Sequence, residues 1–256
     1  MKYDKNEILE FVMGVLGENA DGIYIDNEEV QNGCDDESSL YTAEDGSSAI
    51  VSFGDDYREF HGLTRVVISP DNKDYIIKMP ITGVYEFSKG EFKIVAKFTE
   101  DCENPSDYER VYYEELSKEE KQIFLPLIYV ADYNGIPVYI QKKIDVSLSD
   151  RECEEEALYG YVKELTKENY QEIKEVLKSS VGFNYMDFPE RFAYDVIKFY
   201  GKRKAETFFR KLFEIDDLHE GNVGYVNRRP VVFDYGGYSG KESSWCWLNK
   251  EEDCSE

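Results

Sequence analysis

The chain has 256 residues, a formal net charge of −24, an apolar content of 41% and a charged content of 33%, which is enough for one large domain or two small lobes with cores of their own. The negative charge disfavours nucleic acid as a partner, because its phosphates would be repelled. No apolar run approaches the length of about 18 residues that suggests a membrane span and no signal-like core follows the first residues, so we expect a cytoplasmic protein with no membrane partner.

Residues 1–48 are predicted to form an acidic N-terminal extension. Apolar residues recur at helical spacing over residues 6–16 and Gly17 follows, which predicts a short helix. Residues 18–48 are polar and rich in turn residues, which predicts a loop with isolated extended pieces. No lysine or arginine occurs between Lys5 and Arg58. Two interpretations stay open: a solvated segment packed through its helix, or an acidic arm that masks a basic partner.

Residues 49–145 are predicted to form a lobe made of a sheet and one helix. Alternating segments predict strands at 49–53, 64–69 and 74–79, and a hairpin within 81–101. Asn104 followed by Pro105 is typical of a helix start, and Val111 lies on the apolar side expected for this helix. Two further strands, 124–129 and 136–141, flank an Asn-Gly pair that predicts a tight hairpin.

Residues 146–256 are predicted to form a short helical lobe. Segments with a capping signature lead into stretches whose apolar residues recur at helical spacing, which indicates helices that bury one face in a core. The expected core positions include Ile173, Val176, Phe192, Phe199 and Phe208. A hairpin is expected through residues 227–230, followed by an apolar strand.

Three oxygen-bearing side chains follow these helices. The segment Asp-Leu-His-Glu-Gly-Asn places Asn222 five positions after Asp217, and Asp234 comes twelve positions later in Phe-Asp-Tyr-Gly. One carboxylate to orient a hydroxyl, with an amide and a second carboxylate to hold Mg²⁺, is what phosphoryl transfer requires. The competing interpretation is an acidic turn followed by an ordinary strand.

The two segments resemble the catalytic loop and the metal-binding element of the aminoglycoside phosphotransferase and choline kinase branch of the protein-kinase-like superfamily. The resemblance implies an α+β, two-lobed fold with an antiparallel-sheet N-lobe and a helical C-lobe. It also implies ATP and Mg²⁺ as cofactors, with Asp217 as the catalytic base and with Asn222 and Asp234 as metal ligands that also contribute to cofactor binding.

For the first lobe, the resemblance implies that Lys78 contacts the nucleotide phosphates and that a helix glutamate positions it. Glu109 fits this role best, and Glu114 and Glu115 remain alternatives. The expected phosphate-covering loop, residues 58–65, has one glycine, Gly62, where kinases use three, and Gly54 is a further candidate if the turn begins earlier. The remaining cofactor-binding candidates lie in the expected hinge between the lobes: Gln141 and Lys143.

The sequence therefore predicts a kinase that transfers the γ-phosphoryl group of ATP to a hydroxyl on a protein or a small molecule, with a cationic acceptor or a basic protein as options. The single-glycine loop and the short chain after Asp234 leave a second interpretation open, an inactive pseudokinase that acts as an acidic binding module. A third is an acidic mimic that blocks a basic surface.

Overall fold

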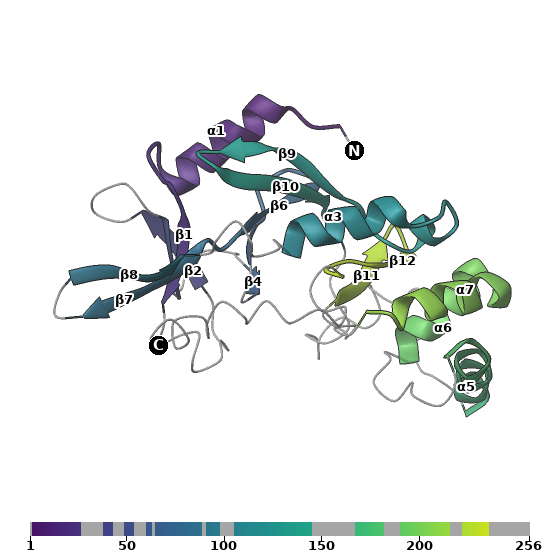
Figure 1. The fold of residues 1–256 in the computed structure, drawn as a ribbon. Coiled ribbons are helices and arrows are strands. Elements are labelled where there is room, and N and C mark those ends of the chain that lie inside the picture. Colours follow the sequence, from purple (N-terminus) through teal and green to yellow (C-terminus); the bar gives the residue numbers. More distant parts are fainter. Residues whose placement is uncertain are drawn as a thin grey trace. The chain divides into compact units, whose positions relative to one another are not determined.

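The computed structural model describes residues 2–26, 38–42, 49–53, 60–62, 65–88, 91–97, 105–144, 167–181, 190–215 and 222–235. These residues have an α+β fold that divides into two compact units (Figure 1). The first unit contains the described residues of Met1–Arg110 and Leu127–Lys142, and the second contains those of Val111–Pro126 and Lys143–Ser243.

The first unit contains an antiparallel sheet of five strands in the part of the chain that is described. Its spatial order is β4 (Phe60–Gly62), β5 (Arg65–Ile68), β6 (Tyr75–Pro80), β10 (Ile136–Lys142) and β9 (Leu127–Tyr133).

The predicted Asn-Gly hairpin of this sheet is confirmed. Asn134 and Gly135 join β9 to β10 with φ angles of 49° and 88°. Two consecutive left-handed residues match the natural twist of a two-residue hairpin, and asparagine and glycine adopt this conformation most readily. The turn therefore sets the pairing of residues 136–138 with residues 131–133, and the register shifts between Val138 and Tyr139 further along the hairpin.

Helix α1 (Lys5–Leu16) packs on one face of this sheet. The side chain of Asp4 caps it by accepting from the N–H of Asn6 at 2.9 Å. The buried face of the helix, which includes Ile8, Val12 and Leu16, belongs to the same core as Ile77 of β6. The predicted helix is confirmed, and it packs on the sheet through its buried face, as the first of the two interpretations of this segment expected.

A second sheet in the first unit changes the predicted assignment of one strand. Its described strands follow the order β2 (Ser38–Thr42), β3 (Ala49–Phe53), β1 (Ile23–Asp26), β7 (Gly83–Ser88) and β8 (Glu91–Lys97), and β1 runs parallel to both of its neighbours.

The prediction that residues 49–53 pair in the sheet of Lys78 is therefore wrong, because β3 pairs with β1 and β2 while β4 takes the edge place beside β5. Alternation identifies a strand but not its partner, which depends on contacts distant in sequence. The predicted hairpin within 81–101 is confirmed as β7 and β8.

The two sheets of this unit are joined at Thr82, between β6 and β7. The N–H and hydroxyl of Thr82 donate to the carbonyl of Ile23 at 2.7 and 3.0 Å, and the N–H of Ile23 donates to the Thr82 hydroxyl at 2.8 Å. A Cβ atom on Gly22 would lie 2.6 Å from that hydroxyl oxygen. A side chain at Gly22 would have to displace the Thr82 hydroxyl or the ring of Tyr24, so glycine suits this close approach.

Helix α3 (Pro105–Glu115) begins at its proline, as predicted. One expectation for this helix is wrong: Val111, placed on its apolar side, is 42% exposed. The buried residues of its first turns are polar instead, Ser106 and Glu109. The helix therefore buries a charged contact where hydrophobic spacing predicted an apolar one.

The second unit contains helices packed against a short hairpin. Its described elements are η1 (Glu120–Gln122), α5 (Lys167–Val181), α6 (Glu190–Tyr200), α7 (Lys202–Leu212), β11 (Val223–Val226) and β12 (Arg229–Val232). The predicted core residues Ile173, Val176, Phe192 and Phe208 are buried together. Phe199 is a correction, because it is 41% exposed in the last turn of α6 and contacts Tyr200 edge-on.

Candidate functional site

Lys78 lies near the middle of the antiparallel sheet, on a face where three polar side chains gather. Val67 of β5 and Tyr139 of β10 are its register partners, and Gln141 is paired with Ile76, two residues before Lys78. Residues opposite each other, or two apart on one strand, share a face. Arg65, two residues before Val67, therefore lies on the face of Lys78 and Gln141, opposite to the face that α1 covers.

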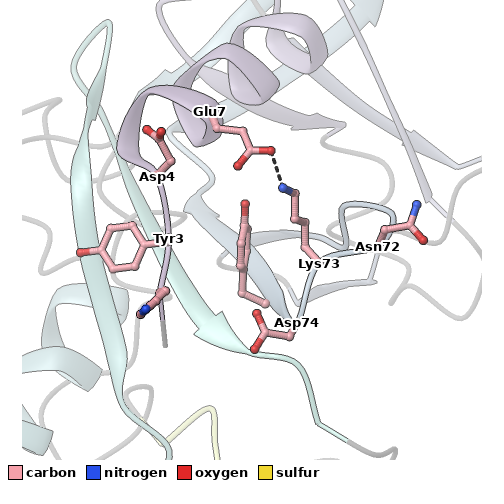
Figure 2. Close-up of a pocket in the computed structure, with 8 residues that line it drawn as sticks. Tyr3, Asp4, Glu7, Asn72, Lys73 and Asp74 are labelled. Carbon is pink, nitrogen blue, oxygen red and sulfur yellow. Dashed lines mark hydrogen bonds and ion pairs between the residues drawn. The ribbon is translucent and has the colours of Figure 1, made fainter.

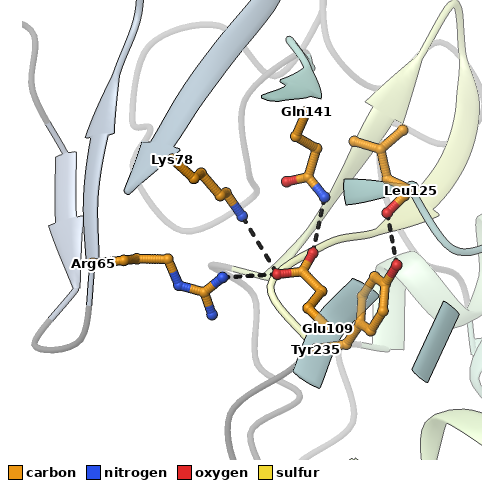
Figure 3. Close-up of polar contacts among 6 residues, drawn as sticks. All are labelled: Arg65, Lys78, Glu109, Leu125, Gln141 and Tyr235. Atoms are coloured by element: carbon orange, nitrogen blue, oxygen red, sulfur yellow. Dashed lines mark hydrogen bonds and ion pairs between the residues drawn. The ribbon is translucent and has the colours of Figure 1, made fainter. Parts of the chain in front are cut away.

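Glu109 of α3 reaches this face and contacts all three polar side chains (Figure 3). Its Oε2 accepts from Nη1 of Arg65 at 2.8 Å and lies 3.8 Å from Nζ of Lys78. Its Oε1 accepts from Nε2 of Gln141 at 2.9 Å. We call these four residues the Glu109 cluster.

The Glu109 cluster is almost fully removed from solvent. The exposed fractions are 4% for Arg65, 2% for Lys78 and 0% for both Glu109 and Gln141. A buried charge is tolerated when it is paired and hydrogen-bonded, and breaking such a pair is strongly destabilising. The carboxylate therefore fixes the first turns of α3 to the sheet as well as approaching the lysine.

The structure distinguishes the three glutamates that the sequence left as alternatives. Glu109 is buried beside Lys78, whereas Glu114 and Glu115 are exposed near the end of the same helix. The expected ion pair between a helix glutamate and the strand lysine is thus formed by Glu109. A role of this pair in nucleotide binding stays a prediction.

Tyr139 of β10 is the register partner of Lys78 on the neighbouring strand, and it is 1% exposed. Burial raises the pKa of its hydroxyl, and the nearby carboxylate of Asp107 raises that pKa further. The side chain packs edge-on against Tyr129, with ring centroids 5.7 Å apart. Tyr139 therefore stays neutral near Lys78 and leaves the charge of this face to the Glu109 cluster.

In the second unit, Asn222 and Asp234 lie at one end of the same hairpin. Val223 of β11 faces Val232 of β12, and one step further the N–H of Phe233 donates to the carbonyl of Asn222 at 3.0 Å. The other end of the hairpin is a turn in which Asn227 and Arg228 have φ angles of 51° and 65°. The predicted hairpin is confirmed, and it brings together the backbones of the two expected metal ligands.

Asp234 has a left-handed backbone, with φ of 56°. This conformation is uncommon for residues other than glycine, and it persists where the surroundings impose it, frequently at functional sites. On one side Phe233 is held by Asn222, and on the other the hydroxyl of Tyr235 donates to the carbonyl of Leu125 at 2.8 Å (Figure 3). The carboxylate of Asp234 is therefore carried by a backbone fixed on both sides.

The remaining predicted residues differ in how much the structure says of them. Asp217 lies outside the described residues. Gly62 ends β4 and is paired with Arg65, so residues 63–64 alone connect β4 to β5. Gln141 is inside the sheet, in register with Ile76 and Leu127, and Lys143 is exposed just after β10.

A magnesium site made of Asn222 and Asp234 fits the donor chemistry of the hairpin end. Mg²⁺ prefers oxygen ligands, keeps several waters, and takes only one or two carboxylates together with substrate phosphates. Within the described ranges, no three His, Cys, Asp or Glu side chains gather as a metal-binding group. The expected site does not need such a group, because it combines an amide with one carboxylate.

A cavity of about 430 Å³ lies elsewhere in the first unit, between the start of α1 and the turn that joins β5 to β6 (Figure 2). Lys73 and Glu7 form an ion pair at its wall, and the hydrogen bond to Glu7 raises the pKa of Lys73. Because α1 covers the sheet face opposite Lys78, this cavity is separate from the Glu109 cluster.

Arg65 is the member of the site that sequence reasoning missed. The alternation of strand side chains already indicated that Arg65 shares a face with Val67, two residues later in the same strand. The register between β5 and β6 was needed to place that face over Lys78 and Glu109.

Comparison of the chain with protein-family profiles, curated proteins and solved structures found no significant match. Among the described helices, none is both long and apolar enough to cross a membrane.

Proposed function

We propose that the chain is an ATP- and Mg²⁺-dependent phosphotransferase with a two-lobed, protein-kinase-like fold. The observation that carries the proposal is the buried ion pair between Lys78 and Glu109. Lys78 lies on the third strand, in chain order, of its antiparallel sheet, and Glu109 lies on the next helix described in the chain, which comes after β7 and β8. In protein kinases a lysine of the third strand and a glutamate of the next helix form the pair that fixes the phosphate-binding ammonium.

The hairpin end of the second unit supports the same proposal independently. There the N–H of Phe233, which precedes Asp234, donates to the carbonyl of Asn222, although eleven residues separate Asn222 from Asp234 in the chain. Asp234 keeps an uncommon left-handed conformation between two anchored aromatic residues. A rigidly held carboxylate beside an amide is suited to orient a hydrated cation.

In this proposal each residue has a distinct task. Asp217 accepts the proton of the acceptor hydroxyl and orients that hydroxyl, while Asn222 and Asp234 hold Mg²⁺. Lys78 contacts the phosphates and Glu109 fixes the direction of its ammonium. The metal supplies neutralisation of the charge that develops on the phosphates. The acceptor is a hydroxyl on a small molecule or a protein, and the charge of −24 favours a cationic one.

The first experiment measures thermal unfolding of the native chain and of Asp234→Asn, with ATP, with Mg²⁺ and with both. A ligand at one hundred times its Kd stabilises a protein by about 2.7 kcal/mol, so the native chain is expected to show a clear shift with MgATP. Asp234→Asn should lose the magnesium-dependent part, because asparagine keeps the left-handed backbone but not the charge.

Glu175→Gln is the matched control for Asp234→Asn. Glu175 is exposed on α5, so this variant removes one negative charge from the same unit without touching the hairpin end. The control should retain the full MgATP shift. An identical unfolding temperature with and without MgATP in the native chain refutes the proposed function.

One observation favours the second candidate, a pseudokinase that binds nucleotide without turnover. Only residues 63–64 separate Gly62 from its register partner Arg65, whereas a phosphate-covering loop normally uses several glycines to bring backbone amides to the phosphates. Labelled ATP offered with a generic basic protein and with small amino alcohols separates the candidates, since an enzyme labels an acceptor and a pseudokinase does not.

A further inference from the structure

The carboxylate of Glu109 is shared unequally by its partners. Arg65 is 2.8 Å from Oε2, which is the length of a charge-assisted hydrogen bond, whereas Lys78 is 3.8 Å from the same oxygen. Gln141 donates to the other oxygen at 2.9 Å. Both oxygens of Glu109 therefore accept a hydrogen bond without a contribution from the lysine.

Arginine is also the better residue to hold a buried carboxylate. Its planar guanidinium keeps its charge and is less strongly hydrated than an ammonium, so that less is lost when it is buried. Arg65 reaches Glu109 from β5, and Gln141 reaches it from β10, so the carboxylate is fixed from both sides of the strand that carries Lys78.

We propose that Arg65, and not Lys78, is the residue that holds Glu109 and the first turns of α3 against the sheet. Arg65 is then a positioning residue, and we assign the contact with an anionic ligand to the ammonium of Lys78, which lies 1.0 Å further from the carboxylate than the guanidinium does. That this ligand is the phosphates of ATP rests on the proposed function. That Arg65 holds Glu109 more strongly than Lys78 does is independent of it.

Two roles that a single lysine–glutamate pair would combine, holding Glu109 and contacting an anionic ligand, are divided here between Arg65 and Lys78. In Arg65→Met, Lys78 becomes the one remaining cation of the Glu109 cluster and is drawn toward the carboxylate. Its contact with a phosphate should weaken as a result. In Lys78→Met, Arg65 and Gln141 still hold Glu109, so α3 keeps its place.

These two variants are matched in charge and burial. Each removes one cation that is less than 5% exposed and leaves one cation paired with Glu109. A difference in behaviour between Arg65→Met and Lys78→Met therefore reports which cation holds the carboxylate, and not a general loss of charge.

The first measurement is a pair of double-mutant cycles on the nucleotide-free chain, Arg65→Met with Glu109→Gln and Lys78→Met with Glu109→Gln, followed by urea unfolding. The coupling of Arg65 to Glu109 should exceed that of Lys78 by about tenfold in the unfolding equilibrium constant, since hydrogen bonds between charged groups weaken with distance. The exposed pair Lys73–Glu7 serves as a control and should show little coupling.

The second measurement compares binding of MgATP and of adenosine to the native chain, Arg65→Met and Arg65→Lys. Arg65→Met should weaken MgATP binding about tenfold or more and leave adenosine binding unchanged, because the phosphates alone contact Lys78. Arg65→Lys should recover part of the loss. A merely structural role of Arg65 would weaken both ligands equally and would overturn the phosphate part of the inference.

The outcomes for Arg65 and for the proposed function can be told apart. A coupling of Lys78 to Glu109 that equals or exceeds that of Arg65 overturns the inference, whatever the chain binds. A native chain that binds no MgATP refutes the proposed function, while the cycles still decide the role of Arg65. If Arg65→Met does not fold, Arg65→Lys decides: full native stability in that variant overturns the inference, and a lower stability supports it.

Discussion

Replacing Glu109 by alanine should destabilise the first unit more than any substitution on the exposed side of α3. The substitution removes a hydrogen-bond acceptor of Arg65 and Gln141 and an ion-pair partner of Lys78, and all three side chains belong to residues less than 5% exposed. Two cations would then remain buried without the carboxylate between them. Removing one partner of a buried pair costs about 3–5 kcal/mol, and the stability of a whole protein is about 5–15 kcal/mol.

The assay is urea unfolding followed by far-ultraviolet circular dichroism. Glu109→Gln should lose less than Glu109→Ala, because it keeps the shape of the side chain and one hydrogen-bonding oxygen. Glu115→Ala is the matched control, since Glu115 is exposed on the same helix, and it should change stability by less than about 0.5 kcal/mol. A loss below about 1 kcal/mol for Glu109→Ala would show that the cluster does not hold α3.

Three further outcomes are expected. Asp234→Gly should keep the fold, because glycine adopts a φ of 56° readily, while the MgATP-dependent shift in thermal unfolding is lost. Tyr225→Phe should destabilise the second unit by about 1–3 kcal/mol in urea, because the tyrosine hydroxyl donates to buried Asp195 at 2.6 Å. Burial raises the pKa of Tyr200 to about 12 from 10.0. The neutral hydroxyl of Tyr200 therefore contributes fully to the stability of the folded chain below pH 10, and this contribution is lost as the pH rises toward 12.

Each of these outcomes has a contrary result. An undiminished MgATP shift in Asp234→Gly would exclude this carboxylate as a metal ligand. Unchanged stability of Tyr225→Phe would mean that the hydrogen bond from the Tyr225 hydroxyl to Asp195 does not stabilise the second unit. For Tyr200, the native chain should be more stable than Tyr200→Phe at about pH 8, and this difference should shrink at about pH 11.5; a constant difference contradicts the raised pKa.

Local signals in the sequence predicted the elements around the site well. Asn134-Gly135 predicted a tight hairpin because few residues tolerate two consecutive positive φ angles, and the structure has it. Pro105 predicted the start of α3, because its missing N–H is not needed there. The alternation of apolar and polar residues predicted the strand β6 with Lys78 on its polar side. It did not predict which strands flank β6.

The failures share a physical cause. Strand β3 satisfies every local rule for a strand, and its partners were still misjudged, because pairing is decided by the burial of whole faces distant in sequence. Phe199 and Val111 follow the helical period, yet each is more than two fifths exposed. Periodicity describes one helix, whereas burial also needs a neighbour at that position.

By itself, the sequence determined the helices, the hairpin turns and the residue types available for chemistry, because these depend on backbone preferences and spacing within a few residues. Only the tertiary structure decided that Glu109, and not Glu114 or Glu115, meets Lys78, and that Arg65 and Gln141 share its carboxylate. The reason is that sheet register places side chains from three strands on one face, and register is fixed by contacts between segments far apart in the chain.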